Sequence, residues 1–96
     1  MQKDDVIAIL RANRSALADL DVGSLRLFGS YSRDAAREDS DVDLMVRFRE
    51  PATFDRFMDL KLYLETLLGR RVDLVTEAAV RPELRLALDR EAIRVA

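Results

Sequence analysis

The chain of 96 residues contains neither cysteine nor histidine. Without cysteine there can be no disulfide, no thiol nucleophile and no thiolate ligand for zinc. Without histidine, no imidazole can act as a general base or as a metal ligand. Any metal that this chain binds by itself must therefore be held by oxygen atoms.

The sequence also lacks a long apolar run and a strong excess of one charge. No apolar stretch approaches the length that spans a bilayer, and the acidic start Met1–Asp5 does not resemble a signal peptide, so we expect a cytoplasmic protein. The 16 basic and 18 acidic residues give a net charge of −2, which offers no global attraction to a membrane or to nucleic acid. Hydrophobic residues make up 49% of the chain, which argues against disorder and predicts one domain over residues 1–96.

Hydrophobic periodicity predicts an α/β chain in the order α-β-α-β-α-β-α. Thr53 is expected as an N-cap, Gly69 as a helix stop and Pro82 as a first helical residue. We expect helices over 4–20, 54–68 and 82–92, a short polar helix or loop over 31–39, and strands over 25–28, 41–48 and 71–76.

Two carboxylates stand two residues apart in Asp41-Val42-Asp43, within a run that otherwise indicates a buried strand. Side chains alternate along a strand, so Asp41 and Asp43 are expected on the face opposite Val42 and Leu44. Two ionised carboxylates about 4 Å apart repel by about 4 kcal/mol at an effective dielectric of about 20. A cation removes this repulsion, and Mg²⁺ is the oxygen-seeking candidate.

A third carboxylate and a glycine turn extend this candidate site. Val72-Asp73-Leu74 repeats Val42-Asp43-Leu44, and a helical connection favours a parallel pairing that brings Asp73 beside the first two. Three carboxylates can hold two metal ions that assist an in-line displacement. Gly29-Ser30 follows another strand, where a glycine and free N–H groups can approach a phosphate and Arg33 can add a charged contact.

Gly29-Ser30, ten further residues and then Asp41-Val42-Asp43 resemble the signature of the DNA polymerase β-like nucleotidyltransferase superfamily. The segments 27–33, 39–46 and 71–75 are similar to its minimal nucleotidyltransferase (MNT) branch. This resemblance covers nearly the whole chain. It implies the nucleotidyltransferase fold, with a small mixed three-stranded sheet covered by helices.

The resemblance also implies a function and a role for each site residue. Gly29, Ser30 and Arg33 would bind the nucleotide, and Asp41, Asp43 and Asp73 would be the catalytic carboxylates that hold two Mg²⁺ ions. AMP would pass from ATP to a hydroxyl, and pyrophosphate would leave. Small MNT proteins are often antitoxins that add AMP to a tyrosine of a partner HEPN-domain ribonuclease toxin, which makes such a toxin the expected partner.

Other interpretations stay open on the sequence alone. The chain could neutralise a toxin by binding without catalysis, or transfer a nucleotide to a small molecule or to RNA. Asp41 and Asp43 could be ordinary acids paired with arginine, Gly29-Ser30 a plain turn, and Arg33 a solvated side chain. A set of apolar residues in two helices is expected in the core but also allows an exposed patch: Phe54, Phe57, Met58, Leu62, Leu84, Leu86 and Leu88.

Overall fold

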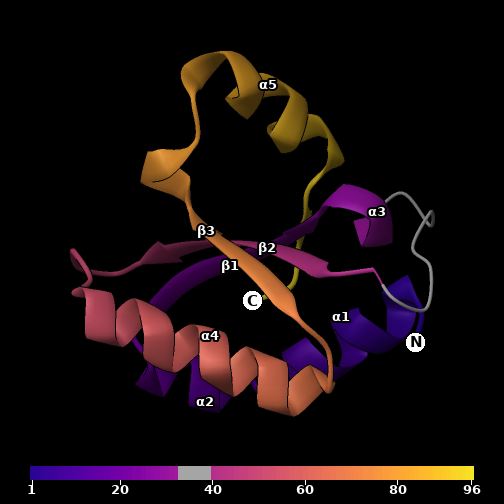
Figure 1. Cartoon of the computed structure of the whole chain (residues 1–96), viewed down its shortest axis with the longest axis vertical. Coiled ribbons are helices and arrows are strands. Elements are labelled where there is room, and N and C mark those ends of the chain that lie inside the picture. Colours follow the sequence, from indigo (N-terminus) through magenta and orange to yellow (C-terminus); the bar gives the residue numbers. More distant parts are fainter. Residues whose placement is uncertain (33–39) are drawn as a thin grey trace.

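The computed structural model describes residues 1–32 and 40–96 as helices around a four-stranded sheet (Figure 1). The sheet has the order β3-β2-β1-β4; β1 is antiparallel to both β2 and β4, and β2 is parallel to β3. The elements are α1 (Lys3–Ala12), α2 (Arg14–Asp19), β1 (Val22–Phe28), α3 (Gly29–Ser32), β2 (Val42–Phe48), α4 (Phe54–Leu68), β3 (Val72–Thr76), the 3₁₀ helix η1 (Glu77–Ala79), α5 (Pro82–Glu91) and β4 (Ile93–Arg94).

The predicted α/β class, the mixed sheet and the parallel pairing are confirmed, but the strand count of three was wrong. β4 has only two residues, too few to show the alternation by which strands are recognised. It pairs with β1 through Arg26 opposite Arg94 and Leu27 opposite Ile93. The last strand thus returns to the edge of the sheet opposite β3.

The single helix expected over 4–20 is divided into α1 and α2 at Asn13. The Asn13 side chain donates from Nδ2 to the carbonyl of Ile9 at 2.8 Å, a local bond that competes with a continuous helix. Gly23, which follows the expected helix, lies in β1 where the pairing with β2 shifts register. The bounds predicted for α4 match the structure, and those of β2, β3 and α5 differ from it by one residue.

The two ends of α4 are determined by local chemistry. Thr53 accepts a hydrogen bond from the backbone N–H of Arg56 at 3.2 Å, which satisfies one of the free donors of the first turn. Gly69 ends the helix in the left-handed region with φ of 65°, where a side chain would be strained. Both predicted caps are confirmed, as is Pro82 in the first turn of α5.

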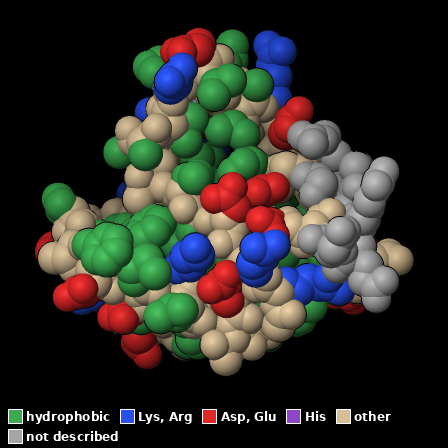
Figure 2. Space-filling model, in the orientation of Figure 1, with side chains coloured by type: hydrophobic (Ala, Val, Ile, Leu, Met, Phe, Trp, Pro, Cys, Tyr) green, Lys and Arg blue, Asp and Glu red, His purple; other side chains and the backbone are tan. Residues whose placement is uncertain are grey.

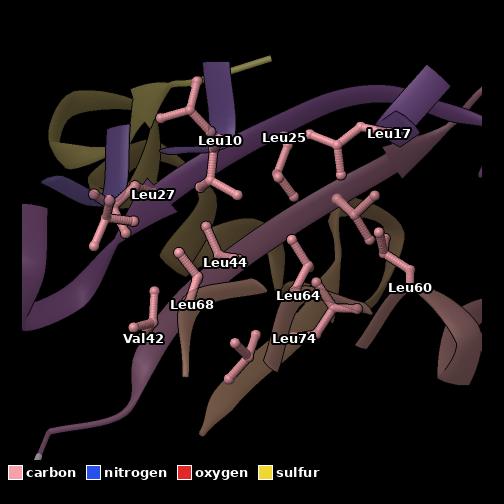
Figure 3. Close-up of a cluster of buried hydrophobic side chains, with 14 of the residues drawn as sticks. Leu10, Leu17, Leu25, Leu27, Val42, Leu44, Leu60, Leu64, Leu68 and Leu74 are labelled. Carbon is pink, nitrogen blue, oxygen red and sulfur yellow. The ribbon is translucent and has the colours of Figure 1, made fainter. Parts of the chain in front are cut away.

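The hydrophobic core lies between one face of the sheet and α1, α2 and α4 (Figure 3). Alternate residues of the central strands reach it, so Leu44 from β2 meets leucines from the helices. The buried leucines and valines labelled in the figure are Leu10, Leu17, Leu25, Leu27, Val42, Leu44, Leu60, Leu64, Leu68 and Leu74. This one-sided burial leaves the residues between them on the opposite face.

That opposite face is crossed by η1 and α5, which lie on the other side of the sheet from α4 (Figure 1). Because β3 and β4 are opposite edges, the segment that joins them has to pass over β2 and β1. Met45, which faces this side, is 1% exposed, yet no residue of α5 is itself buried. α5 therefore covers the face without packing closely into it.

Several apolar residues expected in the core are exposed. Leu84 and Leu86 of α5 are 55% and 65% exposed, and Phe54 and Leu62 of α4 are 75% and 55% exposed. The prediction of a core position was wrong for these four residues, whereas Phe57 packs against the core from its edge. None of the described helices combines the length and the apolar character needed to cross a bilayer.

We expect Leu64→Ala to lower the free energy of unfolding by about 2–5 kcal/mol, because it opens a cavity in a fully buried site. Leu62→Ala, two residues away on the exposed side of the same helix, should change it by less than about 1 kcal/mol. Urea unfolding followed by circular dichroism measures both values. Equal losses in the two variants would contradict the placement of the core.

Candidate active site

Of the predicted site residues, Gly29, Asp43 and Asp73 lie together where β1 ends and where β2 and β3 begin. Phe28, the last residue of β1, lies opposite Asp43, and Asp43 lies beside Asp73 in the parallel pair. Neighbouring strands are about 4.8 Å apart, and residues paired in register share a face. Acidic side chains gather over β2 and β3 in the middle of the face shown in Figure 2.

Gly29 brings the chain directly against one of these carboxylates. A Cβ atom added to Gly29 would lie 2.0 Å from Oδ2 of Asp43 and 2.8 Å from its Cγ. The φ angle of 71° at Gly29 also lies in the left-handed region, which side chains rarely adopt. Two independent constraints, one on space and one on backbone angle, thus require glycine at the turn beside Asp43.

The short helix α3, which follows this turn, is attached to the core by Tyr31. Its side chain is 1% exposed and belongs to the hydrophobic core. The Ser32 hydroxyl donates to the carbonyl of Gly29 at 2.9 Å and closes the turn. The backbone that precedes the 33–39 segment is therefore held beside the carboxylates.

Asp41 lies just outside β2 and is more exposed than Asp43. Its Oδ1 is 3.6 Å from Nε of Arg71, with side-chain exposures of 48% for Asp41 and 84% for Arg71. An ion pair this open contributes little to stability, so the Asp41 carboxylate can leave Arg71 at small cost. Next to this ion pair, the backbone N–H of Val42 donates a hydrogen bond to the carbonyl of Arg71 at 2.9 Å, which fixes the backbone beside Asp41.

Glu65 positions the beginning of β3, a role that the sequence reading did not find. Its Oε2 accepts a hydrogen bond from the backbone N–H of Val72 at 3.0 Å, across the turn between α4 and β3. Asp73 is the next residue, so this bond helps to hold it in register with Asp43. Glu65 and Val72 come together only through the turn between α4 and β3, and no local sequence motif predicts this hydrogen bond.

The donor chemistry of these residues suits Mg²⁺, which prefers carboxylate oxygens and retains some of its water. Asp43 and Asp73 are register partners, and Gly29 leaves room on one side of Asp43. Within residues 1–32 and 40–96, however, no three acidic side chains are already gathered into a metal site. Asp41 would have to turn away from Arg71 to join the other two. The Ser30 side chain and Arg33 lie outside what the structure describes.

The strand β1, the turn at Gly29 and the helix α3 thus face carboxylates on two parallel strands. The nucleotidyltransferase domain family matches residues 8–95, and the chain belongs to this family. The protein adenylyltransferase MntA of Thermococcus cleftensis is 39% identical over 93 residues, which are 96% of this chain and 94% of the relative.

Solved structures share the fold over most of this chain. A structure described as that of a candidate minimal nucleotidyltransferase is 45% identical with a TM-score of 0.85, and the match covers 97% of this chain and 95% of the other. A toxin–antitoxin structure with AMP-PNP has a TM-score of 0.73 at 21% identity and covers 100% and 73% of the two chains. A tri-AMPylated Shewanella oneidensis HEPN toxin in complex with its MNT antitoxin has a TM-score of 0.61 at 20% identity, covering 91% and 71%.

We expect Gly29→Ala to be more destabilising than Gly69→Ala. Both glycines have a positive φ, which costs alanine about 1–2 kcal/mol, but nothing lies within 4 Å of a Cβ on Gly69. The extra loss at Gly29, about 1–3 kcal/mol from overpacking, should come from the Asp43 carboxylate.

A double-mutant cycle with Asp43→Ala tests this cause through unfolding free energies. Removal of the Asp43 carboxylate should recover most of the extra loss in Gly29→Ala. Additive effects of the two substitutions would show that Gly29 and Asp43 do not press against each other.

Proposed function

We propose that the chain is a Mg²⁺-dependent protein adenylyltransferase that transfers AMP from ATP to a tyrosine hydroxyl of a HEPN-domain toxin and thereby acts as its antitoxin. The observation that carries the proposal is the register of Asp43 with Asp73, with Gly29 packed against Asp43, in a chain of the nucleotidyltransferase family. We place this activity in the unit of residues 1–96 and in the cytoplasm.

The chain's own residues can be given separate roles. The N–H groups at the start of α3 and the close backbone at Gly29 would bind the triphosphate, with help from Ser30 and Arg33. Asp41, Asp43 and Asp73 would hold Mg²⁺, which when bound neutralises the phosphate charge and lowers the pKa of a coordinated hydroxyl. Asp73, on the outer strand, is exposed and can approach the acceptor hydroxyl and accept its proton.

Transfer would be an in-line displacement at the α-phosphate. The acceptor oxygen forms a bond to phosphorus as the bond to pyrophosphate breaks, and the hydroxyl proton leaves to the nearby base. The protein itself forms no covalent bond to the substrate in this step. Positioning of the reactants and electrostatic stabilisation of the transition state would therefore supply most of the rate enhancement.

The nature of the acceptor is supported by the relatives. The MntA relative is named as a protein adenylyltransferase, and a neighbour of the same fold is an MNT antitoxin bound to an AMPylated HEPN toxin. The exposed leucines Leu84 and Leu86 of α5 are compatible with contact to a protein. The HEPN toxin of that neighbour is described as tri-AMPylated. We therefore expect that this chain can add more than one AMP unit to its acceptor.

The test is to co-express the chain with the protein encoded beside it and to measure the intact mass of that partner. One or more added AMP masses are expected with the native chain. Asp41→Asn, Asp43→Asn or Asp73→Asn should each lower transfer by about a hundredfold or more, because each removes a charge that stabilises the transition state. Asp59→Asn, at an exposed position of α4, is the matched control and should leave transfer unchanged.

A second readout does not depend on turnover. Mg²⁺ with a non-hydrolysable ATP analogue should raise the melting temperature of the native chain, and the rise should be much smaller in Asp43→Asn. The opposite result has two parts: the native chain leaves the partner unmodified, and the three variants still bind and neutralise it. That result would replace the proposal with an antitoxin that acts by binding alone.

A further inference from the structure

A hollow lies on the same face of the sheet as Asp43, beneath the segment that carries α5. Its volume is about 440 Å³, and its lining residues come from β1, β2, η1 and the end of the chain: Ser24, Arg26, Arg47, Glu77, Ala92 and Arg94. Three of these six residues are arginines and one is acidic. The role proposed above for the carboxylates leaves this hollow without a function.

Arg26 is neutralised within the structure. Its guanidinium donates to Oδ1 of Asp89 at 2.8 Å and lies 3.4 Å from Oε2 of Glu77, while its side chain is 21% exposed. Glu77 is shared with Arg85 of α5. These contacts hold η1 and α5 over the sheet, so Arg26 and Glu77 serve as supports of the hollow.

Arg47 and Arg94 are different, because neither forms an ion pair with an acidic side chain in the described ranges. Arg94 donates from Nε to the carbonyl oxygen of Ala96 at 3.2 Å, which leaves its other N–H groups free. The register places Arg47 opposite Ser24 and Arg94 opposite Arg26, so both arginines flank β1 on the side of the hollow. Both residues line the hollow, and their unpaired N–H groups give its wall a positive charge. The pair therefore favours a negatively charged ligand.

Ser24 adds a hydroxyl to the lining of the hollow. The residue is 8% exposed and lies on the outer face of β1, outside the hydrophobic core. Within the described ranges its hydroxyl has no hydrogen-bond partner, and because it is reached by solvent it is available to a ligand. A hydroxyl donor beside two arginines suits an oxyanion, which accepts charge-assisted bonds from all three.

We propose that this hollow is an anion-binding subsite in which Arg47, Arg94 and Ser24 bind a phosphate or carboxylate group carried by the acceptor. The assignment to the acceptor rests on the proposed function. Arg47 lies four residues after Asp43 on the same strand face, which corresponds to about 13 Å at about 3.3 Å per residue. An acceptor anchored there lies along the face that leads to the carboxylates.

Binding can be tested without catalysis, by titration of the ¹⁵N-labelled chain with inorganic phosphate in EDTA. Saturable shifts are expected at the amides of Ser24, Arg47, Ala92 and Arg94. Arg47→Gln should weaken phosphate binding about tenfold, since it removes a charged hydrogen bond. Arg90→Gln, an exposed arginine of α5 outside the lining, should bind as the native chain does.

Shifts confined to Gly29–Tyr31, no saturable shift, or equal weakening in both variants would overturn the subsite. Arg94→Gln provides a second variant if Arg47→Gln fails to fold, because the two arginines are on different strands.

Transfer kinetics then identify the source of the anion. Arg47→Gln should raise KM for the acceptor about tenfold and leave KM for ATP unchanged. An effect on the first AMP addition indicates a carboxylate of the acceptor, and an effect on later additions alone indicates the phosphodiester of AMP already attached.

An unchanged acceptor KM at every addition would overturn the acceptor assignment. Absence of transfer to any acceptor would refute the proposed function, while the phosphate titration still decides whether the subsite exists.

Discussion

The register of β2 between β1 and β3 is the constraint on which the candidate site depends. Val42, Leu44 and Val46 are each 0% exposed, and their burial determines which face of β2 meets the core. A shift of one residue would bury Asp43 and expose all three apolar side chains, so the core resists it. The same register sets Phe28 and Asp73 on either side of Asp43. Hydrophobic packing on one face thus positions the carboxylates on the other.

The path of the chain explains why α5 is so little buried. The sheet order requires the segment between β3 and β4 to cross the outer face, where the strands present Ser24, Arg26 and Arg47 beside the apolar Met45. A helix above such a mixed face is not held by hydrophobic contact alone. Ion pairs from Arg26 to Asp89 and Glu77 hold it instead, which leaves its leucines exposed and a space below it.

The sequence predicted those parts of the molecule that depend on local pattern. The strand around Asp43, the caps at Thr53 and Gly69 and the parallel neighbour carrying Asp73 all follow from alternation, turn chemistry and the helical connection. It did not predict β4, whose two residues carry no pattern, or the bond from Glu65 to Val72, which depends on a turn in space. Leu84 and Leu86 were placed in the core because helical spacing shows that a helix has an apolar side but not whether anything covers it.

Opposite charges are separated along the outer face of the sheet, so a chain of nearly neutral net charge can still bind anionic substrates. The net charge of −2 hides a face that is acidic at Asp43 and Asp73 and basic at Arg47 and Arg94. At the acidic end, a phosphate can be bound only if a cation comes with it, because carboxylates and phosphate repel each other. At the basic end, arginine supplies that charge permanently, so no metal is needed there. A substrate with two anionic groups would therefore need a metal only for the group at the acidic end. The group without a bound metal would lie at the basic end, and this would determine the orientation of the substrate on the face.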